Sequence, residues 1–309
     1  MPGPDKNPLQ VDFFHCPDYG PKFTHRLEKA FASCGCSFSG LKVLVKPNLV
    51  AAKNSGAGCT HPAFTAEASR ILLDSGAKVT VADSPAFGSA AKVAKKIGLD
   101  KYLQPLGLKA LTLDRGRRMD LSGFRVLVSE AALEADVIVN LPKLKAHSQM
   151  RLSVAVKNLF GCVCGLHKAL WHTRIGSCRE SFAALILEVC RLFPSVFTVV
   201  DGVWAMHGTG PIHGRLINLE KIICGQDAVA VDTALYKMFG LLPAEVPLYR
   251  VASDLNLPGA DPGAVRISGE QAGSWAKMRL PRTLKSADFS LPYLTLSLFK
   301  RLKQRIFPG

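Results

Sequence analysis

The stretch VIVNLPKLKAHSQMRLSVAVKNLFG, residues 137–161, begins as an apolar strand and continues as a basic segment. It contains three lysines, a histidine and two asparagines among leucines and valines, and it has no aspartate or glutamate. A solvated surface segment would mix both signs of charge. Positive charge placed beside core residues, with no carboxylate near it in sequence, therefore indicates a crevice that binds an anion.

Short apolar runs that reach a polar residue recur on both sides of this stretch. LKVLVK (41–46) ends at Lys46, and AKVTVAD (77–83) ends at Asp83. Three more runs follow the same pattern: ADVIVN (135–140), VFTVVD (196–201) and EKIICGQD (220–227). Near-continuous Val and Ile runs of this length are typical of parallel strands that are covered on both faces.

Helical patterns separate several of these runs. Residues 60–76 have the spacing of a helix, with Thr60 as the expected N-cap and Gly76 at its end. Residues 179–194 and 227–240 are also helical in pattern. This alternation predicts an α/β fold, with a mainly parallel β-sheet flanked by helices on both faces, in one unit or two lobes.

Three regions are expected along the chain. Residues 1–40 form an N-terminal extension with a helix at 23–36, and residues 41–274 form the α/β domain. Residues 275–309 form a basic amphipathic tail, in which leucines alternate with lysine and arginine. Such a tail suits peripheral contact with an anionic membrane, or packing on its own domain or on a partner subunit.

The net charge of +15 predicts attraction to an acidic partner: nucleic acid, anionic lipid, or a phosphorylated or carboxylated metabolite. No apolar run approaches the roughly 20 residues that a membrane-spanning helix needs. The N-terminal residues have no apolar region typical of a secretory signal. A cytoplasmic protein with mostly reduced cysteines is therefore expected.

In parallel sheets, ligands bind beyond the carboxyl ends of the strands. The polar residues at those ends are expected to gather at one edge of the sheet: Lys46, Asn48, Asp83, Asn140 and Asp201. The alternative is that each of them simply begins a loop.

The basic segment adds further side chains to this edge. Pro142 keeps the following chain extended, so alternate side chains at Lys143, Lys145 and His147 are expected on one face, roughly 7 Å apart per step. Lys157, Asn158, Lys168 and His172 follow. Crowded cations repel unless an anion lies between them, and crowding lowers lysine pKa values, which makes a lysine a candidate base or nucleophile. An exposed basic face that contributes only solubility is the alternative.

Roles follow from the residue types. The candidate catalytic residues are His147, His172, Lys145, Asp83 and Asp201. The candidate anion- or cofactor-binding residues are Lys46, Asn48, Lys143, Lys157, Asn158 and Lys168. The candidate metal ligands are His61, His147 and His172. The cofactor itself is unknown, with a metal ion or an iron–sulfur cluster as candidates.

A thiol group also lies in this region. Cys162 and Cys164 precede His167 in GCVCGLH (161–167), and thiolates so grouped can bind iron, zinc or an iron–sulfur cluster. Two small thiols in a loop are the favoured alternative, because a C-x-C pair alone lacks a four-ligand pattern.

One buried acidic residue needs a partner. Asp232 shares a helical stripe with apolar residues, so its carboxylate requires a hydrogen-bonding or charged group. A lysine of the basic segment and a backbone N–H at a helix N-terminus are equal candidates.

Seven stretches resemble the family catalogued as domain of unknown function 362. They are VKPNLV (45–50), THPAFT (60–65), VTVADSPAFG (79–88), the basic segment 137–161, HKALWH (167–172), VVDGVWAMHGTGPIHG (199–214) and GQDAVAVDTALYKMFG (225–240). The resemblance covers roughly residues 40–245. It implies cytosolic proteins, often fused to ferredoxin-like segments, and hence redox or iron–sulfur chemistry. This chain has no C-x-x-C-x-x-C run and resembles a stand-alone member, so no cluster is transferred to Cys162 and Cys164.

The sequence leaves three functions open. The first is an enzyme that binds an anionic small molecule or cofactor at the carboxyl edge of the sheet. The second is a non-catalytic carrier or assembly protein for a metal, cluster or cofactor. The third, nucleic-acid binding, is disfavoured because Phe160 and Trp171 are the only aromatics near the basic residues, whereas nucleic-acid surfaces interleave aromatics with lysine and arginine. The identity of any partner protein is unknown from the sequence.

Overall fold

The predicted parallel strands form the centre of one large sheet in the computed structural model, which describes residues 9–50, 56–85, 88–273 and 275–285. The parallel strands are β10 (Val196–His207), β7 (Val137–Leu141), β2 (Lys42–Pro47), β3 (Lys78–Asp83) and β4 (Ala110–Thr112), in that spatial order. The remaining strands of this path are β11 (Arg215–Gly225), β1 (Gln10–His15) and β12 (Arg266–Gly269). The predicted mainly parallel α/β fold is confirmed.

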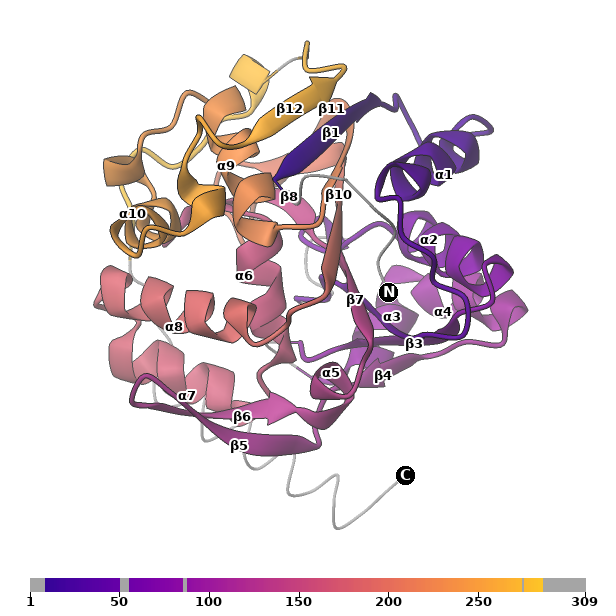
Figure 1. Cartoon of the computed structure of the whole chain (residues 1–309), viewed down its shortest axis with the longest axis horizontal. Coiled ribbons are helices and arrows are strands. Elements are labelled where there is room, and N and C mark those ends of the chain that lie inside the picture. The colour runs from indigo at the N-terminus through magenta and orange to yellow at the C-terminus, as the bar shows by residue number, and fades with distance from the viewer. Residues whose placement is uncertain (1–8, 51–55, 86–87, 274, 286–309) are drawn as a thin grey trace.

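Helices cover both faces of the sheet (Figure 1). One layer contains α1 (Phe23–Ser33), α2 (Pro62–Asp74), α3 (Ala90–Ile97) and α4 (Leu99–Leu103). The other contains α6 (Ala155–Leu159), α7 (Leu166–Ile175), α8 (Arg179–Arg191), α9 (Ala228–Met238) and α10 (Pro247–Asp254). Successive residues of β2 face opposite layers: Val43 and Val45 pack with the first, and Leu44 with the second.

The run at 220–227 is not a parallel strand. It belongs to β11, which pairs antiparallel with β10. Only residues 208–214 separate β10 from β11, and a parallel crossover needs a dozen residues or more, so the chain must turn back as a hairpin. The run therefore ends away from the carboxyl edge, where Asp227 caps α9 by accepting the N–H of Ala230 at 2.7 Å.

The first forty residues contribute to the sheet itself. β1 lies between β11, to which it is antiparallel, and β12, to which it is parallel. The division of the chain at residues 40 and 274 stays a prediction, but β1 shows that residues before 40 supply an inner strand as well as helix α1. The tail beyond residue 285 lies outside the described residues.

The extended path after Pro142 is confirmed. β8 (Lys143–His147) continues beyond the end of β7, pairs parallel with β10 and pairs antiparallel with β9 (Arg151–Ser153). The pairing with β10 is irregular, since Lys143 lies opposite Asp201 whereas Lys145 lies opposite Met206. An advance of two positions along β8 thus corresponds to an advance of five along β10, so regular pairing is lost there.

Helix α2 has a different N-cap from the one expected. His61, not Thr60, is the N-cap, and its Nδ1 accepts the N–H of Ala63 at 3.3 Å. The Thr60 hydroxyl instead donates to the carbonyl of Leu141 at 2.6 Å, because it lies against the end of β7. Thr60 therefore joins the start of α2 to the edge of the sheet.

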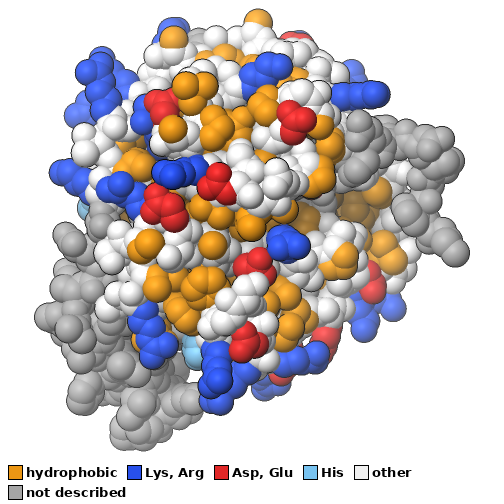
Figure 2. Space-filling model, turned by 60° about the vertical axis from the view of Figure 1, so that its left-hand side comes forward, with side chains coloured by type: hydrophobic (Ala, Val, Ile, Leu, Met, Phe, Trp, Pro, Cys, Tyr) orange, Lys and Arg blue, Asp and Glu red, His pale blue; other side chains and the backbone are white. Residues whose placement is uncertain are grey.

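A two-stranded hairpin completes the layer of α7 and α8. It consists of β5 (Gly116–Leu121) and β6 (Phe124–Ser129), followed by α5 (Glu130–Leu133). The ring of Phe124 contacts Trp171 of α7 edge to face, with 5.5 Å between the ring centroids. Among the described helices, each is too short or too polar to cross a membrane. On the face in Figure 2, basic, acidic and apolar side chains are interspersed.

Candidate anion-binding site

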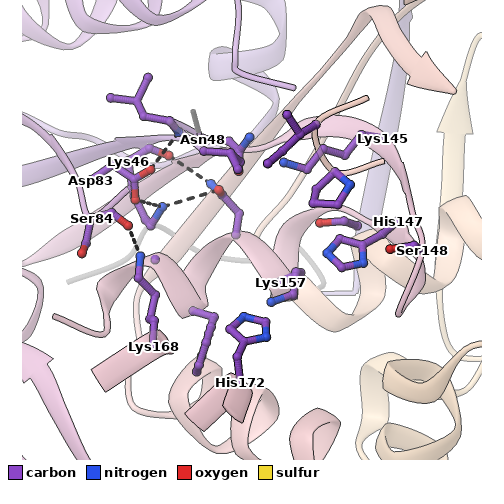
Figure 3. A pocket seen from close by; sticks show the side chains of 18 of the residues that line it. Lys46, Asn48, Asp83, Ser84, Lys145, His147, Ser148, Lys157, Lys168 and His172 are labelled. Carbon is purple, nitrogen blue, oxygen red and sulfur yellow. Dashed lines mark hydrogen bonds and ion pairs between the residues drawn. The ribbon is translucent and has the colours of Figure 1, made fainter. Parts of the chain in front are cut away.

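A cavity of about 160 Å³ lies beyond the carboxyl ends of β2 and β3, between β8, α6 and α7 (Figure 3). Nine of the residues that line it are site candidates from the sequence. The nine are Lys46, Asn48, Asp83, Lys145, His147, Lys157, Asn158, Lys168 and His172. Ser84, which directly follows the end of β3, lines the cavity as well. Pro211 and Ile212 also line the cavity.

Lys46 and Asp83 form a buried ion pair at the base of the cavity. The Lys46 Nζ lies 2.7 Å from Asp83 Oδ1, and both side chains are almost wholly buried. The other oxygen of Asp83 accepts the backbone N–H of Leu49 at 2.8 Å. The carboxylate of Asp83 thereby neutralises the charge of Lys46. This lysine therefore joins the ends of β2 and β3, and its charge is not available to balance a bound anion.

A glycine makes room for this pair. A Cβ atom on Gly161 would lie 2.4 Å from Lys46 Nζ and 2.5 Å from Asp83 Oδ1. Any side chain at this position would displace one of the two charged groups. Asn158, three residues earlier on α6, donates from Nδ2 to the Lys46 carbonyl at 3.2 Å and to Asn140 Oδ1 at 2.8 Å. The asparagines therefore anchor α6 to the strands.

The other three lysines of the wall have no carboxylate partner among the described residues. Lys145 Nζ donates to the Gly58 carbonyl at 3.2 Å, and Lys168 Nζ donates to the Ser84 carbonyl. Lys157 Nζ lies over the rings of Phe160 and Phe182, 4.9 Å from each centroid.

Burial lowers the pKa of all three ammonium groups. Lys168 and Lys145 lower that of Lys157 further, whereas the nearby Asp83 partly offsets the effect of burial at Lys145 and Lys168. The pKa of Lys145 falls to about 8, that of Lys157 to about 7, and that of Lys168 to about 8. The charged forms are disfavoured because they are removed from water and repel one another.

Both histidines of the wall are neutral at physiological pH. Burial lowers the pKa of His147 and of His172 well below 6.5, and the nearby Lys157 lowers both further. His147 Nδ1 accepts the backbone N–H groups of Gln149 at 3.1 Å and Met150 at 3.3 Å. The neutral ring of His147 must then carry its proton on Nε2, which leaves an N–H donor on the other side of the ring.

Lys143, Asp201 and His61 lie apart from the cavity wall, in a second polar cluster. Lys143 Nζ pairs with Asp201 Oδ2 at 2.9 Å, and the backbone N–H of His61 donates to the same oxygen at 2.9 Å. The hydroxyl of Tyr19 donates to Asp201 Oδ1 at 2.7 Å, and its ring stacks on His61 with 3.8 Å between centroids. The irregular pairing of β8 with β10 separates Lys143 from Lys145 and His147.

Asp232 is held by the backbone, which decides between its two candidate partners. Its Oδ1 accepts the N–H of Ala155, the first residue of α6, at 2.7 Å. Burial raises the pKa of Asp232 to about 7. This contact fixes the start of the short helix that carries Lys157 and Asn158.

The three metal-ligand candidates are not brought together. His147 and His172 line the cavity, whereas His61 belongs to the second cluster. Over the described ranges, no three His, Cys, Asp or Glu side chains are grouped as metal ligands. Burial raises the pKa of Cys162 to about 12 and that of Cys164 to about 11, so both thiols are protonated at neutral pH.

Comparison with known proteins gives a family and two similar chains. The family described as "Domain of unknown function (DUF362)" matches residues 43–237. Thylakoid-associated protein sll1697 of Synechocystis sp. is 34% identical over 273 residues, which cover 84% of this chain and 83% of that protein. The lactate racemase apoprotein of Thermoanaerobacterium thermosaccharolyticum is 15% identical with a TM-score of 0.44, over 72% of this chain and 56% of the other. At that level the structural similarity carries no argument about function.

Proposed function

Because this chain belongs to the DUF362 family, and all residues of the cavity wall lie within the matched range, we propose that its function resides in this cavity. The protein is proposed to be an enzyme that binds an anionic small molecule between the lysines. We further propose that it does so in the cytoplasm.

One observation carries this proposal: among the residues that the structure describes, the wall has four lysines and a single carboxylate. Lys46 is neutralised by Asp83, which leaves Lys145, Lys157 and Lys168. Bringing three ammonium groups to one enclosed space is unfavourable unless an anion lies among them. A bound anion would restore their pKa values toward that of a lysine in water, and this gain supplies binding free energy.

The neutral histidines supply the chemistry. A neutral imidazole that reaches the ligand can act as a general base, and its N–H group can donate a hydrogen bond to the ligand. His147 presents an N–H donor from Nε2, and His172 is the second candidate on the wall. The proposed reaction is therefore proton transfer to or from the bound anion, with Lys145 and Lys168 holding its negative charge.

A thermal-shift measurement tests the site. Pyruvate or phosphate, added to the full chain at low ionic strength, is expected to raise its melting temperature. An anion at 100 times its Kd adds about 2.7 kcal/mol to the stability of the protein. Lys145→Met and Lys168→Met are each expected to raise the apparent Kd for the anion at least tenfold, because each removes one cation from the wall. The increase in melting temperature at a given anion concentration should shrink accordingly.

Lys95→Met is the matched control, because Lys95 is an exposed lysine on α3. It should respond to the anions as the unaltered protein does. Circular dichroism verifies that each variant is folded. Equal responses from all three variants would contradict the site.

We also propose that the protein makes peripheral contact with anionic membranes. The net charge of +15 supports this, and so does the similarity to a protein named thylakoid-associated. Co-sedimentation with vesicles of anionic lipid is expected to retain the full chain and to weaken as salt rises. Vesicles of zwitterionic lipid should retain little of it.

The basic tail is the segment assigned to this contact from the sequence. A chain ending at Lys285 is therefore expected to lose most of the vesicle binding. Undiminished binding of the shortened chain would move the contact to another surface. Failure of the full chain to sediment with anionic vesicles would refute membrane contact.

A further inference from the structure

The cavity differs from a simple anion site because one of its amines has no polar partner among the described residues. Building on the proposed function, we propose that Lys157 is a nucleophile that forms an imine with an anionic carbonyl compound, and that short-chain 2-oxo acids are the substrate class. If so, Lys145 and Lys168 hold the carboxylate of the substrate while Lys157 attacks its carbonyl carbon.

The partners of the four lysines single out Lys157. The other three amines donate hydrogen bonds: Lys46 to Asp83, Lys145 to the Gly58 carbonyl and Lys168 to the Ser84 carbonyl. A donated hydrogen bond favours the protonated amine, which cannot attack a carbonyl. Lys157 contacts aromatic faces instead (4.9 Å to the Phe160 and Phe182 centroids), and these offer no lone pair to hold its protons.

These surroundings also supply the unprotonated amine that an imine requires. Burial and the neighbouring cations Lys168 and Lys145 disfavour the ammonium form, which brings the pKa of Lys157 to about 7. A substantial fraction of the side chain is therefore a neutral amine at physiological pH. A lysine that is desolvated and beside other cations is the usual form of an imine-forming nucleophile.

The size and charge of the cavity select the substrate. Its volume of about 160 Å³ is below the roughly 300–1,000 Å³ of pockets that enclose drug-sized ligands, so a small acid suits it better than a nucleotide. In a 2-oxo acid the carbonyl carbon is bonded directly to the carboxylate. Cations that hold the carboxylate therefore also place the carbonyl beside the third amine.

The step balances without an oxidant or reductant. The lone pair of Lys157 Nζ forms a bond to the carbonyl carbon, and the carbonyl oxygen takes a proton to give a carbinolamine. The C–O bond then breaks, and the oxygen leaves as water with the two hydrogens that the amine has lost. The Nε2–H group of His147 can donate a hydrogen bond to the carbonyl oxygen during the addition, and the two protons that the amine loses are the two that the oxygen gains.

Reductive trapping tests the inference. The full chain is incubated with pyruvate and cyanoborohydride, and its intact mass is measured. The expected product is heavier by one pyruvic acid less one oxygen atom, and peptide mapping should place the addition on Lys157. Propionate, which has the carboxylate but no carbonyl group, should give no adduct.

Two variants give the test its controls. Lys157→Arg keeps the positive charge but cannot form the imine, so its adduct should fall at least 100-fold while circular dichroism shows a folded protein. Lys95→Arg, at an exposed lysine, should trap as much pyruvate as the unaltered chain. Trapping spread equally over exposed lysines, or undiminished in Lys157→Arg, would overturn the inference.

The outcome also separates this inference from the proposed function. If pyruvate and propionate both raise the melting temperature but pyruvate is not trapped, the anion site stands and the imine is wrong. If neither acid nor phosphate changes the melting temperature and nothing is trapped, both proposals fail.

Discussion

Replacing Asp83 by asparagine is expected to lower the free energy of unfolding by about 3–5 kcal/mol, as is typical when one partner of a buried ion pair is removed. The substitution leaves the Lys46 ammonium, whose side chain is fully buried, without its carboxylate. Asparagine has nearly the same size, so the loss reflects charge and not packing. Urea denaturation at pH 7 measures the change.

Two comparisons isolate the cause. The double variant Lys46→Met with Asp83→Leu removes both charges and should recover most of the lost stability, because apolar replacements of similar volume often match a buried pair. Glu180→Gln removes one partner of the exposed pair with Arg250, 3.8 Å apart, and should cost less than about 1 kcal/mol. A loss as small for Asp83→Asn as for Glu180→Gln would show that the buried pair does not stabilise the fold.

The stability of the ligand-free protein is expected to rise with pH between about 7 and 9. In the unfolded chain lysines keep their protons until about pH 10.5, whereas in the fold Lys157 releases its proton near pH 7 and Lys145 and Lys168 near pH 8. Across this window the unfolded state binds more protons, so raising the pH favours the fold. Each lysine contributes up to about 1.4 kcal/mol per pH unit.

Other titrating groups limit the pH range in which the three lysines dominate the pH dependence of stability. Burial raises the pKa of Asp232 to about 7, and its destabilising effect grows only as pH rises toward that value. Burial also raises the pKa of Cys162 from 9.0 to about 12, which opposes the lysines above pH 9. Urea denaturation at several pH values between 7 and 9 should show the slope, and Lys157→Met should reduce it. An equal slope in that variant would mean that Lys157 titrates normally.

Ligand affinity should change in the opposite direction. A bound anion favours the ammonium forms, so raising the pH through 7 to 8 removes the charges that hold it. Saturating pyruvate is therefore expected to flatten the dependence of stability on pH.

Much of the site could be predicted because strand ends are a property of the local sequence. β2 and β3 end where the apolar runs meet Lys46 and Asp83, and parallel strands place such ends at one edge. Lys145 and His147 were also placed correctly, since the chain stays extended after Pro142. These features depend on a few consecutive residues.

The errors arise where distant segments decide the structure. Alternation along an extended chain predicts that Lys143 lies on the same face as Lys145 and His147. The irregular register with β10 instead places Lys143 opposite Asp201, with which it forms an ion pair. Asp201 itself lies in the middle of a twelve-residue strand and not at its end, because β11 and β8 extend the pairing of β10 beyond residue 201. Tyr19, which contacts both Asp201 and His61, had no local signal at all.

The place of β1 bears on how this protein can be subdivided. A fragment confined to the family limits, 43–237, would omit both β1 and β12. The backbone N–H and C=O groups of β11 that pair with residues 11–15 would then be exposed along a free edge, next to Ile222 and Ile223. Unprotected edges of this kind promote association between chains. The segment matched by the family model is thus smaller than the sheet to which it belongs.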